Sequence, residues 1–189
     1  MEDEKIIELY FERKESAITE TALKYGNYLY KIAYNILLNN EDSEESVNDT
    51  YLGAWNAVPP EKPRIFSAFL SKITRYISLN KWRSKKTEKR GSGEVDLAFE
   101  EIEECVPSNN SVFEEIETKE LAKMISDFLK KLPGTERVIF IRRYYYFDSV
   151  SDICKKFGFS KSKTSTLLCR TRKKILSFLE KEGMLDERR

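Results

Sequence analysis

The chain has 189 residues, of which 40% are hydrophobic and 34% charged, and its 33 basic residues nearly balance 32 acidic ones. This length fits one large domain or two small ones, and no segment has the roughly eighteen uninterrupted apolar residues of a membrane-spanning helix. Histidine is absent, which excludes histidine-based catalytic triads and most catalytic zinc sites.

The N-terminal stretch and the cysteines favour a cytoplasmic protein. The acidic N-terminal stretch MEDEKIIELY is unlike a signal peptide. Cys105, Cys154 and Cys169 lie far apart and lack C-x-x-C spacing, so we expect reduced thiols. We expect no bound metal and no cofactor, and no catalytic residue set is evident.

Helical periodicity dominates the whole chain, and no alternating strand pattern stands out. The expected helices cover about 3–12, 15–38, 40–58, 66–89, 113–131, 134–146, 149–157 and 161–181, with Asn40 as the N-cap of the third. The predicted fold is therefore all-α. It consists of two small helical domains, 1–90 and 113–189, joined by an acidic flexible linker over 91–112.

Charge is strongly segregated along this nearly neutral chain. Residues 72–90 carry eight basic side chains against one acid, and residues 155–179 carry eight bases and no acid. Between them, residues 91–120 carry ten acids against one lysine. Protein surfaces usually mix the two signs, so these blocks indicate separate electrostatic roles.

The third expected helix contains the sequence DSEESVNDTYLGAW. Its apolar positions follow helical spacing and predict a core-facing side. The opposite side carries Glu45, Asn48, Asp49 and Asn56 around a lone leucine, Leu52. This pattern fits a protein-docking surface, but a solvated acidic face with one stray leucine fits it equally well.

The fourth expected helix mixes aromatic residues with a rising density of bases. Tyr76, Asn80, Arg83 and Lys86 follow i, i+4, i+7, i+10 spacing and can face solvent together. Single-stranded DNA is bound by this mixture, because cations contact the backbone while aromatic and amide groups contact unstacked bases.

Residues 148–181 have the pattern of a helix-turn-helix, whose second helix enters the DNA major groove. Asp148 or Ser149 can cap the first helix, Gly158 supplies the turn, and Ser160 caps the second. The outer face of that second helix carries Ser162, Lys163, Thr166, Cys169, Arg170 and Lys173. A merely solvated basic helix is the alternative, although such helices normally include acids.

Together, three segments resemble the extracytoplasmic-function sigma factors of bacterial RNA polymerase. DSEESVNDTYLGAW is similar to their core-binding helix, and FSAFLSKITRYISLNKWRSKK to the segment that melts and reads the minus-ten element. The stretch from LPGTERV to RTRKKI is similar to their minus-thirty-five-reading domain.

The resemblance implies roles for particular residues. Those implied for docking on core polymerase are Asp42, Glu45, Asn48, Asp49 and Leu52. Those implied for DNA are Lys62, Arg64, Tyr76, Asn80, Arg83 and Lys86 on the melted non-template strand, and Ser162, Lys163, Ser165, Thr166, Arg170 and Lys173 on the upstream duplex.

The expected function is thus promoter-specific transcription initiation as a sigma factor, without enzymatic activity of its own. Its expected partners are core RNA polymerase and promoter DNA, and the family would also allow an anti-sigma protein. A stand-alone helix-turn-helix regulator would explain the C-terminal pattern but leave the docking helix and residues 64–90 without a role. An interaction module that does not bind DNA is a second alternative.

Overall fold

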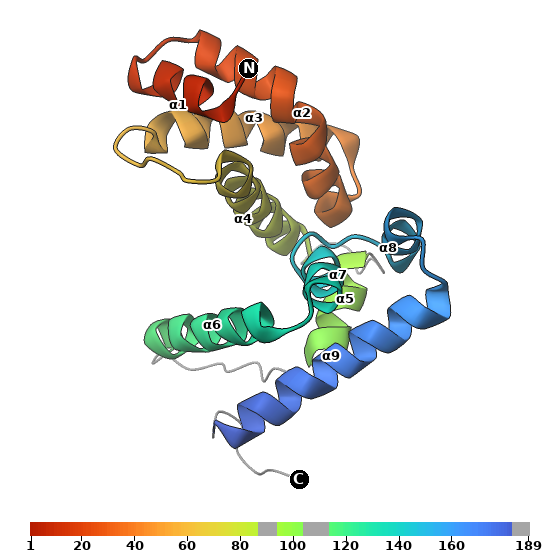
Figure 1. Ribbon diagram of the computed structural model, residues 1–189. Coiled ribbons are helices and arrows are strands. Elements are labelled where there is room, and N and C mark those ends of the chain that lie inside the picture. The colour runs from red at the N-terminus through yellow and green to blue at the C-terminus, as the bar shows by residue number, and fades with distance from the viewer. Residues whose placement is uncertain (87–93, 104–113, 183–189) are drawn as a thin grey trace. The chain divides into compact units, whose positions relative to one another are not determined.

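The computed structural model describes residues 1–86, 94–103 and 114–182, and the chain divides into two units, Met1–Gly93 and Glu94–Arg189 (Figure 1). The described residues form helices and contain no strand, which confirms the all-α prediction for them. None of the described helices combines the length and apolar character needed to cross a membrane. The helices are α1 (Asp3–Phe11), α2 (Ser16–Leu37), α3 (Asn40–Ala57), α4 (Phe66–Lys86), α5 (Glu94–Glu103), α6 (Glu114–Lys131), α7 (Gly134–Tyr144), α8 (Val150–Phe157) and α9 (Lys161–Lys181).

Most predicted helix boundaries lie within two residues of the observed ones, but the predicted cap of α3 is wrong by one residue. The side-chain oxygen of Asn39 accepts a hydrogen bond from the Asp42 backbone N–H at 2.9 Å, so Asn39 is the N-cap and Asn40 the first helical residue. Neighbouring asparagines are equally good caps in sequence, and here Asn39 has the extended backbone of an N-cap while Asn40 is already helical.

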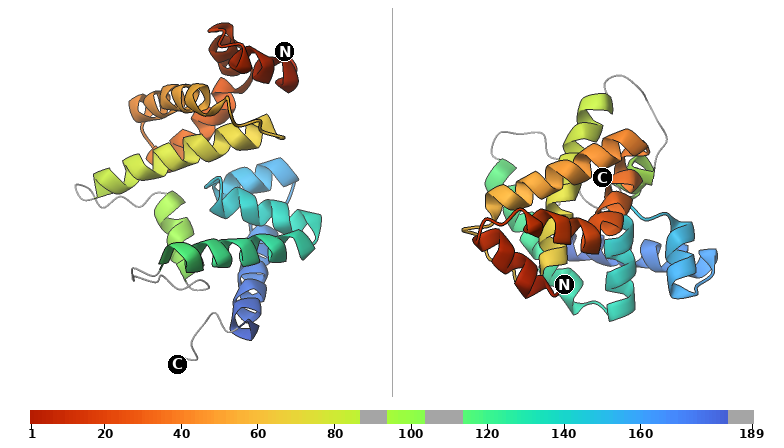
Figure 2. Two further views of the ribbon diagram at one scale, coloured as in Figure 1. Left: turned by 90° about the vertical axis from the view of Figure 1, so that its left-hand side faces the viewer. Right: turned by 90° about the horizontal axis from the view of Figure 1, so that it is seen from above.

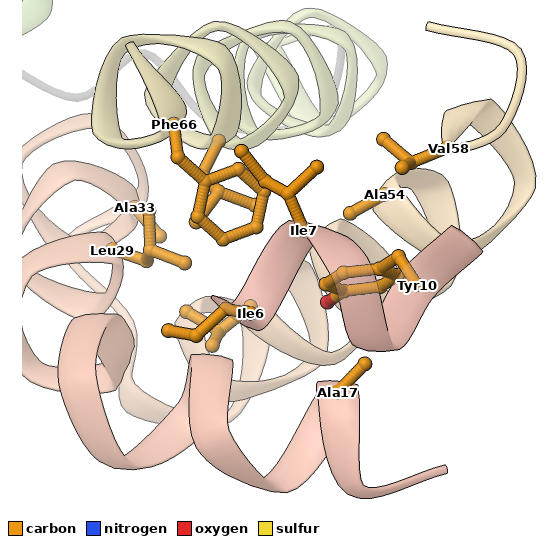
Figure 3. Packing of buried hydrophobic residues seen from close by; sticks show 11 residues of the cluster. Ile6, Ile7, Tyr10, Ala17, Leu29, Ala33, Ala54, Val58 and Phe66 are labelled. Carbon is orange, nitrogen blue, oxygen red and sulfur yellow. The ribbon is translucent and has the colours of Figure 1, made fainter. Parts of the chain in front are cut away.

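The first unit is built around the apolar faces of its four helices. Ile6, Ile7 and Tyr10 of α1 insert between α2 and the start of α4, where they meet Leu29 and Phe66 (Figure 3). The Tyr10 ring packs edge-on against Phe66, with ring centres 5.9 Å apart. This burial of aliphatic and aromatic side chains supplies most of the unit's stability.

Helices α3 and α4 pack together through small polar side chains. Ser43, Ser46, Thr50, Ser71, Thr74 and Ser78 are all buried. The Thr50 and Thr74 hydroxyl oxygens lie 2.9 Å apart, and a Cβ at Gly53 would lie 3.0 Å from Cγ2 of Ile73. Small residues let the two backbones approach closely, and α3 accordingly lies alongside both α2 and α4 (Figures 1 and 2).

The second unit has its own core, made by α5, α7, α8 and α9. Ile139, Phe140, Phe147, Ile153, Leu168, Ile175 and Leu179 are buried there. Phe128 of α6 stacks on Phe178 of α9, with ring centres 4.7 Å apart. Each unit therefore has the separate hydrophobic core expected of a small domain.

Part of the expected flexible linker is helical. Residues 94–103 form α5, which belongs to the second unit, where Val95 and Ala98 are buried and the Phe99 ring lies 5.8 Å from that of Phe147. This segment was expected to be a linker because it is acidic, but its few apolar residues follow helical spacing and form one face. Residues 91–93 and 104–112 lie outside the described part of the chain, and the functional division at 90 and 113 stays a prediction.

Leu29→Ala should destabilise the first unit by about 3 kcal/mol, because Leu29 is 0% exposed and its removal leaves a cavity. Leu23→Ala on the same helix is the matched control, since Leu23 is 77% exposed and should cost less than about 0.5 kcal/mol. Both tryptophans, Trp55 and Trp82, lie in this unit, so their fluorescence during urea unfolding reports on it alone. Equal losses in the two variants would contradict the described packing.

Candidate nucleic-acid interface

The residues predicted to dock on polymerase share α3 but differ in exposure. Asn48, Asp49 and Leu52 are exposed to solvent, and Leu52 is one of the large apolar side chains that the first unit leaves uncovered. Asp42 is different, because its side chain is only 15% exposed. The structure thus presents Asn48, Asp49 and Leu52 together on α3, while Asp42 turns toward α4.

Two ion pairs join α3 to α4. The Lys85 ammonium donates to both carboxylate oxygens of Asp42, at 2.7 and 2.6 Å. The Lys81 ammonium lies 2.8 Å from Oε2 of Glu45, and the lysine side chain is 16% exposed. Two acids predicted to dock on a partner are therefore paired with bases from the predicted DNA-binding helix.

The exposed side of α4 matches the sequence prediction. Tyr76, Asn80 and Arg83 are all exposed and follow one another at intervals of four and three residues. Such spacing places them on one helix face, where an aromatic ring, an amide and a guanidinium are available to a ligand. Lys62 and Arg64 are exposed in the loop before α4, while the Lys86 side chain lies outside the described residues.

Helices α8 and α9 are joined by a short turn at Gly158, which has φ 66°. This left-handed conformation favours glycine, because a Cβ would be strained there. The Ser149 and Ser160 hydroxyls accept hydrogen bonds from the backbone N–H groups of Asp152 and Lys163, and so cap α8 and α9. The predicted turn and caps are confirmed, with Ser149 rather than Asp148 as the first cap.

The outer face of α9 carries the side chains predicted to read duplex DNA. Ser162, Lys163, Ser165, Thr166, Arg170 and Lys173 are all exposed. Helical spacing predicts a core-facing stripe on the other side of α9. Its residues Thr164, Leu168, Thr171, Ile175 and Leu179 are buried, and Leu167 and Phe178 are half-buried. The Lys163 ammonium lies 3.6 Å from the centre of the Phe159 ring, which holds this cation at the start of the helix.

Sequence reasoning missed a cluster of charges inside the second unit. Arg143 of α7 is 1% exposed, and its guanidinium donates to Oε1 of Glu101 at 2.9 Å. The Tyr144 hydroxyl and Arg172 of α9 donate to Oε2 of Glu101, at 2.7 and 3.3 Å. Glu101 thus ties α5 to α7 and α9. A fully buried arginine needs such a partner, because an unpaired buried charge is costly.

This environment changes the acidity of Glu101. Burial alone would raise the pKa of its carboxyl, but the hydrogen bonds from Arg143 and Tyr144 and the charges of Arg143 and Arg172 outweigh burial and lower the pKa below its ordinary value. Burial together with the Glu101 carboxylate raises the pKa of the Tyr144 hydroxyl. The cluster therefore holds a carboxylate between two cations at neutral pH.

The described residues contain no group of three or more histidine, cysteine or acidic side chains that could hold a metal ion. Residues 22–88 match the family model of sigma-70 region 2, so α3, α4 and all of α2 after its first six residues lie within that match. No curated protein sequence matches the chain. The region 2 match supports a sigma-70 family sigma factor, and it includes both the α3 face and the exposed side of α4.

Glu101→Gln should destabilise the second unit by about 2 kcal/mol at neutral pH, because the buried Arg143 guanidinium would lose its ion pair with the Glu101 carboxylate. The lowered pKa means that Glu101 stabilises the folded state fully above its ordinary pKa, and that this contribution is lost as the pH falls from the ordinary pKa through the lowered one. The variant should therefore lose part of the wild-type pH dependence over that range. Glu100→Gln, at the exposed neighbouring position, is the control and should leave it unchanged.

The measurement compares circular dichroism, which follows both units, with tryptophan fluorescence, which follows the first unit alone. The Glu101→Gln loss should appear in the dichroism and not in the fluorescence. A loss of the same size in Glu100→Gln would show that general charge, rather than the buried cluster, is responsible.

Proposed function

We propose that this chain, whose region 2 match indicates a sigma factor involved in transcription initiation, is an extracytoplasmic-function sigma factor. In this role it binds bacterial core RNA polymerase and directs it to promoters through two DNA-binding domains. Region 2 docks on the polymerase through α3 and captures the melted non-template strand with α4. The helix pair α8 and α9 binds the upstream duplex.

The observation that carries this proposal is the exposed row on α4 inside the region 2 match. Tyr76 offers a stacking surface, Asn80 offers hydrogen bonds to a base edge, and Arg83 offers a charge to the phosphate backbone. Holding an unpaired base costs a few kcal/mol in lost stacking and pairing, which such contacts must offset. A face used only for solvation would not need an exposed tyrosine.

The second unit supports the duplex-binding part of the proposal. Its turn at Gly158 and the Ser160 cap begin α9, whose first turns bury Thr164 and expose hydroxyl and cationic side chains on the opposite side. Hydroxyls and arginine can contact base edges, while lysines contact phosphates. Two domains with few contacts each bind promoter DNA well only when both are held at one site, because linkage raises the effective concentration.

The proposed role assigns no covalent chemistry to the chain itself. RNA synthesis belongs to the polymerase, so the protein would act in the cytoplasm as a specificity subunit without a cofactor. An anti-sigma protein that occupies the same surfaces is compatible with this role.

Run-off transcription with purified core polymerase on a library of randomised upstream DNA tests the proposal directly. We expect transcripts that depend on the protein, from templates that share two spaced motifs. Protein alone that shifts duplex DNA, without any binding or redirection of the polymerase, would instead establish a stand-alone regulator. Weak dependence of DNA binding on salt would argue against phosphate contacts altogether.

Arg170→Ala should weaken upstream recognition by about tenfold, because a lost base or phosphate contact from an arginine costs about 1–3 kcal/mol. Lys181→Ala, at the exposed far end of the same helix, removes one cation as well and serves as the control. Transcription from the selected template measures both variants. Equal losses would show that α9 attracts DNA through its overall charge and not through its N-terminal half.

A further inference from the structure

The two ion pairs between α3 and α4 form an antiparallel ladder. Asp42 precedes Glu45 by one turn of α3, and their partners Lys85 and Lys81 follow the reverse order on α4. The same register continues inward, because Thr50 faces Thr74 and Gly53 faces Ile73. The charged pairs are thus the outer end of the seam that joins the two helices.

This outer end of α4 depends on polar contacts. Leu79 is buried, but none of the described side chains after it on α4 is buried, and Lys81 and Trp82 are half-buried. Apolar packing therefore contributes less to the last turns of the helix than to its start. Asn80 and Arg83, two of the proposed DNA contacts, lie within these turns.

Asp42 is also poorly placed to contact a partner protein. Both of its carboxylate oxygens already accept from the Lys85 ammonium, and the side chain is 15% exposed. Docking through Asp42 would require its pair with Lys85 to break. The exposed Asn48, Asp49 and Leu52 carry no such cost.

We propose that Asp42 is a positioning residue for DNA capture, and that it acts through Lys85. This pair holds the last turns of α4 against the start of α3, so that Asn80 and Arg83 keep a fixed orientation toward the melted strand. Docking on polymerase then rests on Asn48, Asp49 and Leu52. This inference rests on the proposed function, because it assigns α3 a role in DNA capture in addition to docking on polymerase.

A double-mutant cycle tests whether Asp42 acts through Lys85. The variants are Asp42→Asn, Lys85→Gln and the two combined, in the full-length protein. Two measurements separate the roles, namely the affinity for core polymerase and the fraction of heparin-resistant open complex on the template selected from the library. Glu41→Gln is the matched control, because Glu41 is an exposed acid in the same first turn of α3. Its charge interacts favourably with the helix dipole, as that of Asp42 does.

We expect Asp42→Asn to leave polymerase affinity within about twofold and to lower the open-complex equilibrium about fivefold, the effect of losing a partly buried ion pair. In the Lys85→Gln background the same change should have no further effect. Asp49→Asn should show the opposite pattern, with weaker polymerase binding. Hydrogen exchange should be faster at the amides of 81–86 in Asp42→Asn but not in Glu41→Gln.

Loss of polymerase affinity in Asp42→Asn, in both backgrounds, would overturn the inference and make Asp42 a docking residue. No change in open-complex formation would also overturn it, even if hydrogen exchange is faster, because the pair would then be structural alone. Failure of the proposed function is distinct from both outcomes, since the wild-type protein itself would then not redirect the polymerase.

Discussion

The close approach of α3 and α4 is the constraint on which the first unit depends. Thr50, Thr74 and Gly53 lie at their interface, and the helix backbones are near enough for the Thr50 and Thr74 hydroxyls to meet. A side chain at Gly53 would begin only 3.0 Å from Cγ2 of Ile73, so the Ile73 side chain would have to shift. This closeness brings the acidic start of α3 beside the basic end of α4, where opposite charges pair.

The second unit depends on a different interaction, the ion pair of a buried arginine. Arg143 lies inside the core, and Glu101 provides its counter-charge from a segment whose composition suggests a linker. Because Tyr144 and Arg172 contact the same carboxylate, α5, α7 and α9 are joined at one point. The acidic segment is thus partly structural, and α9 is supported on the side away from its exposed basic face.

The α3–α4 contact and the buried ion pair have a common consequence for the proposed function. A DNA-binding helix carries many cations on one face, and these cations repel one another unless acidic side chains lie nearby. In α4 the counter-charges come from α3, and in α9 they come from Glu101 and from Glu136, which pairs with Lys174. Arg83, Arg170 and Lys173, which the proposal assigns to DNA, are among the bases that stay exposed.

The sequence by itself determined the helical class, most helix boundaries, the turn at Gly158, the cap at Ser160 and the solvent face of α9, because these follow from helical spacing and from local backbone chemistry. It also indicated the exposed row of Tyr76, Asn80 and Arg83 and, through the resemblance, a sigma factor. The tertiary structure decided what depends on contacts between segments far apart in the chain. It paired Asp42 with Lys85, paired Glu101 with Arg143, and packed residues 94–103 as a helix. Contacts between residues far apart in the chain produce no periodic pattern in the sequence, so sequence reasoning could not find them.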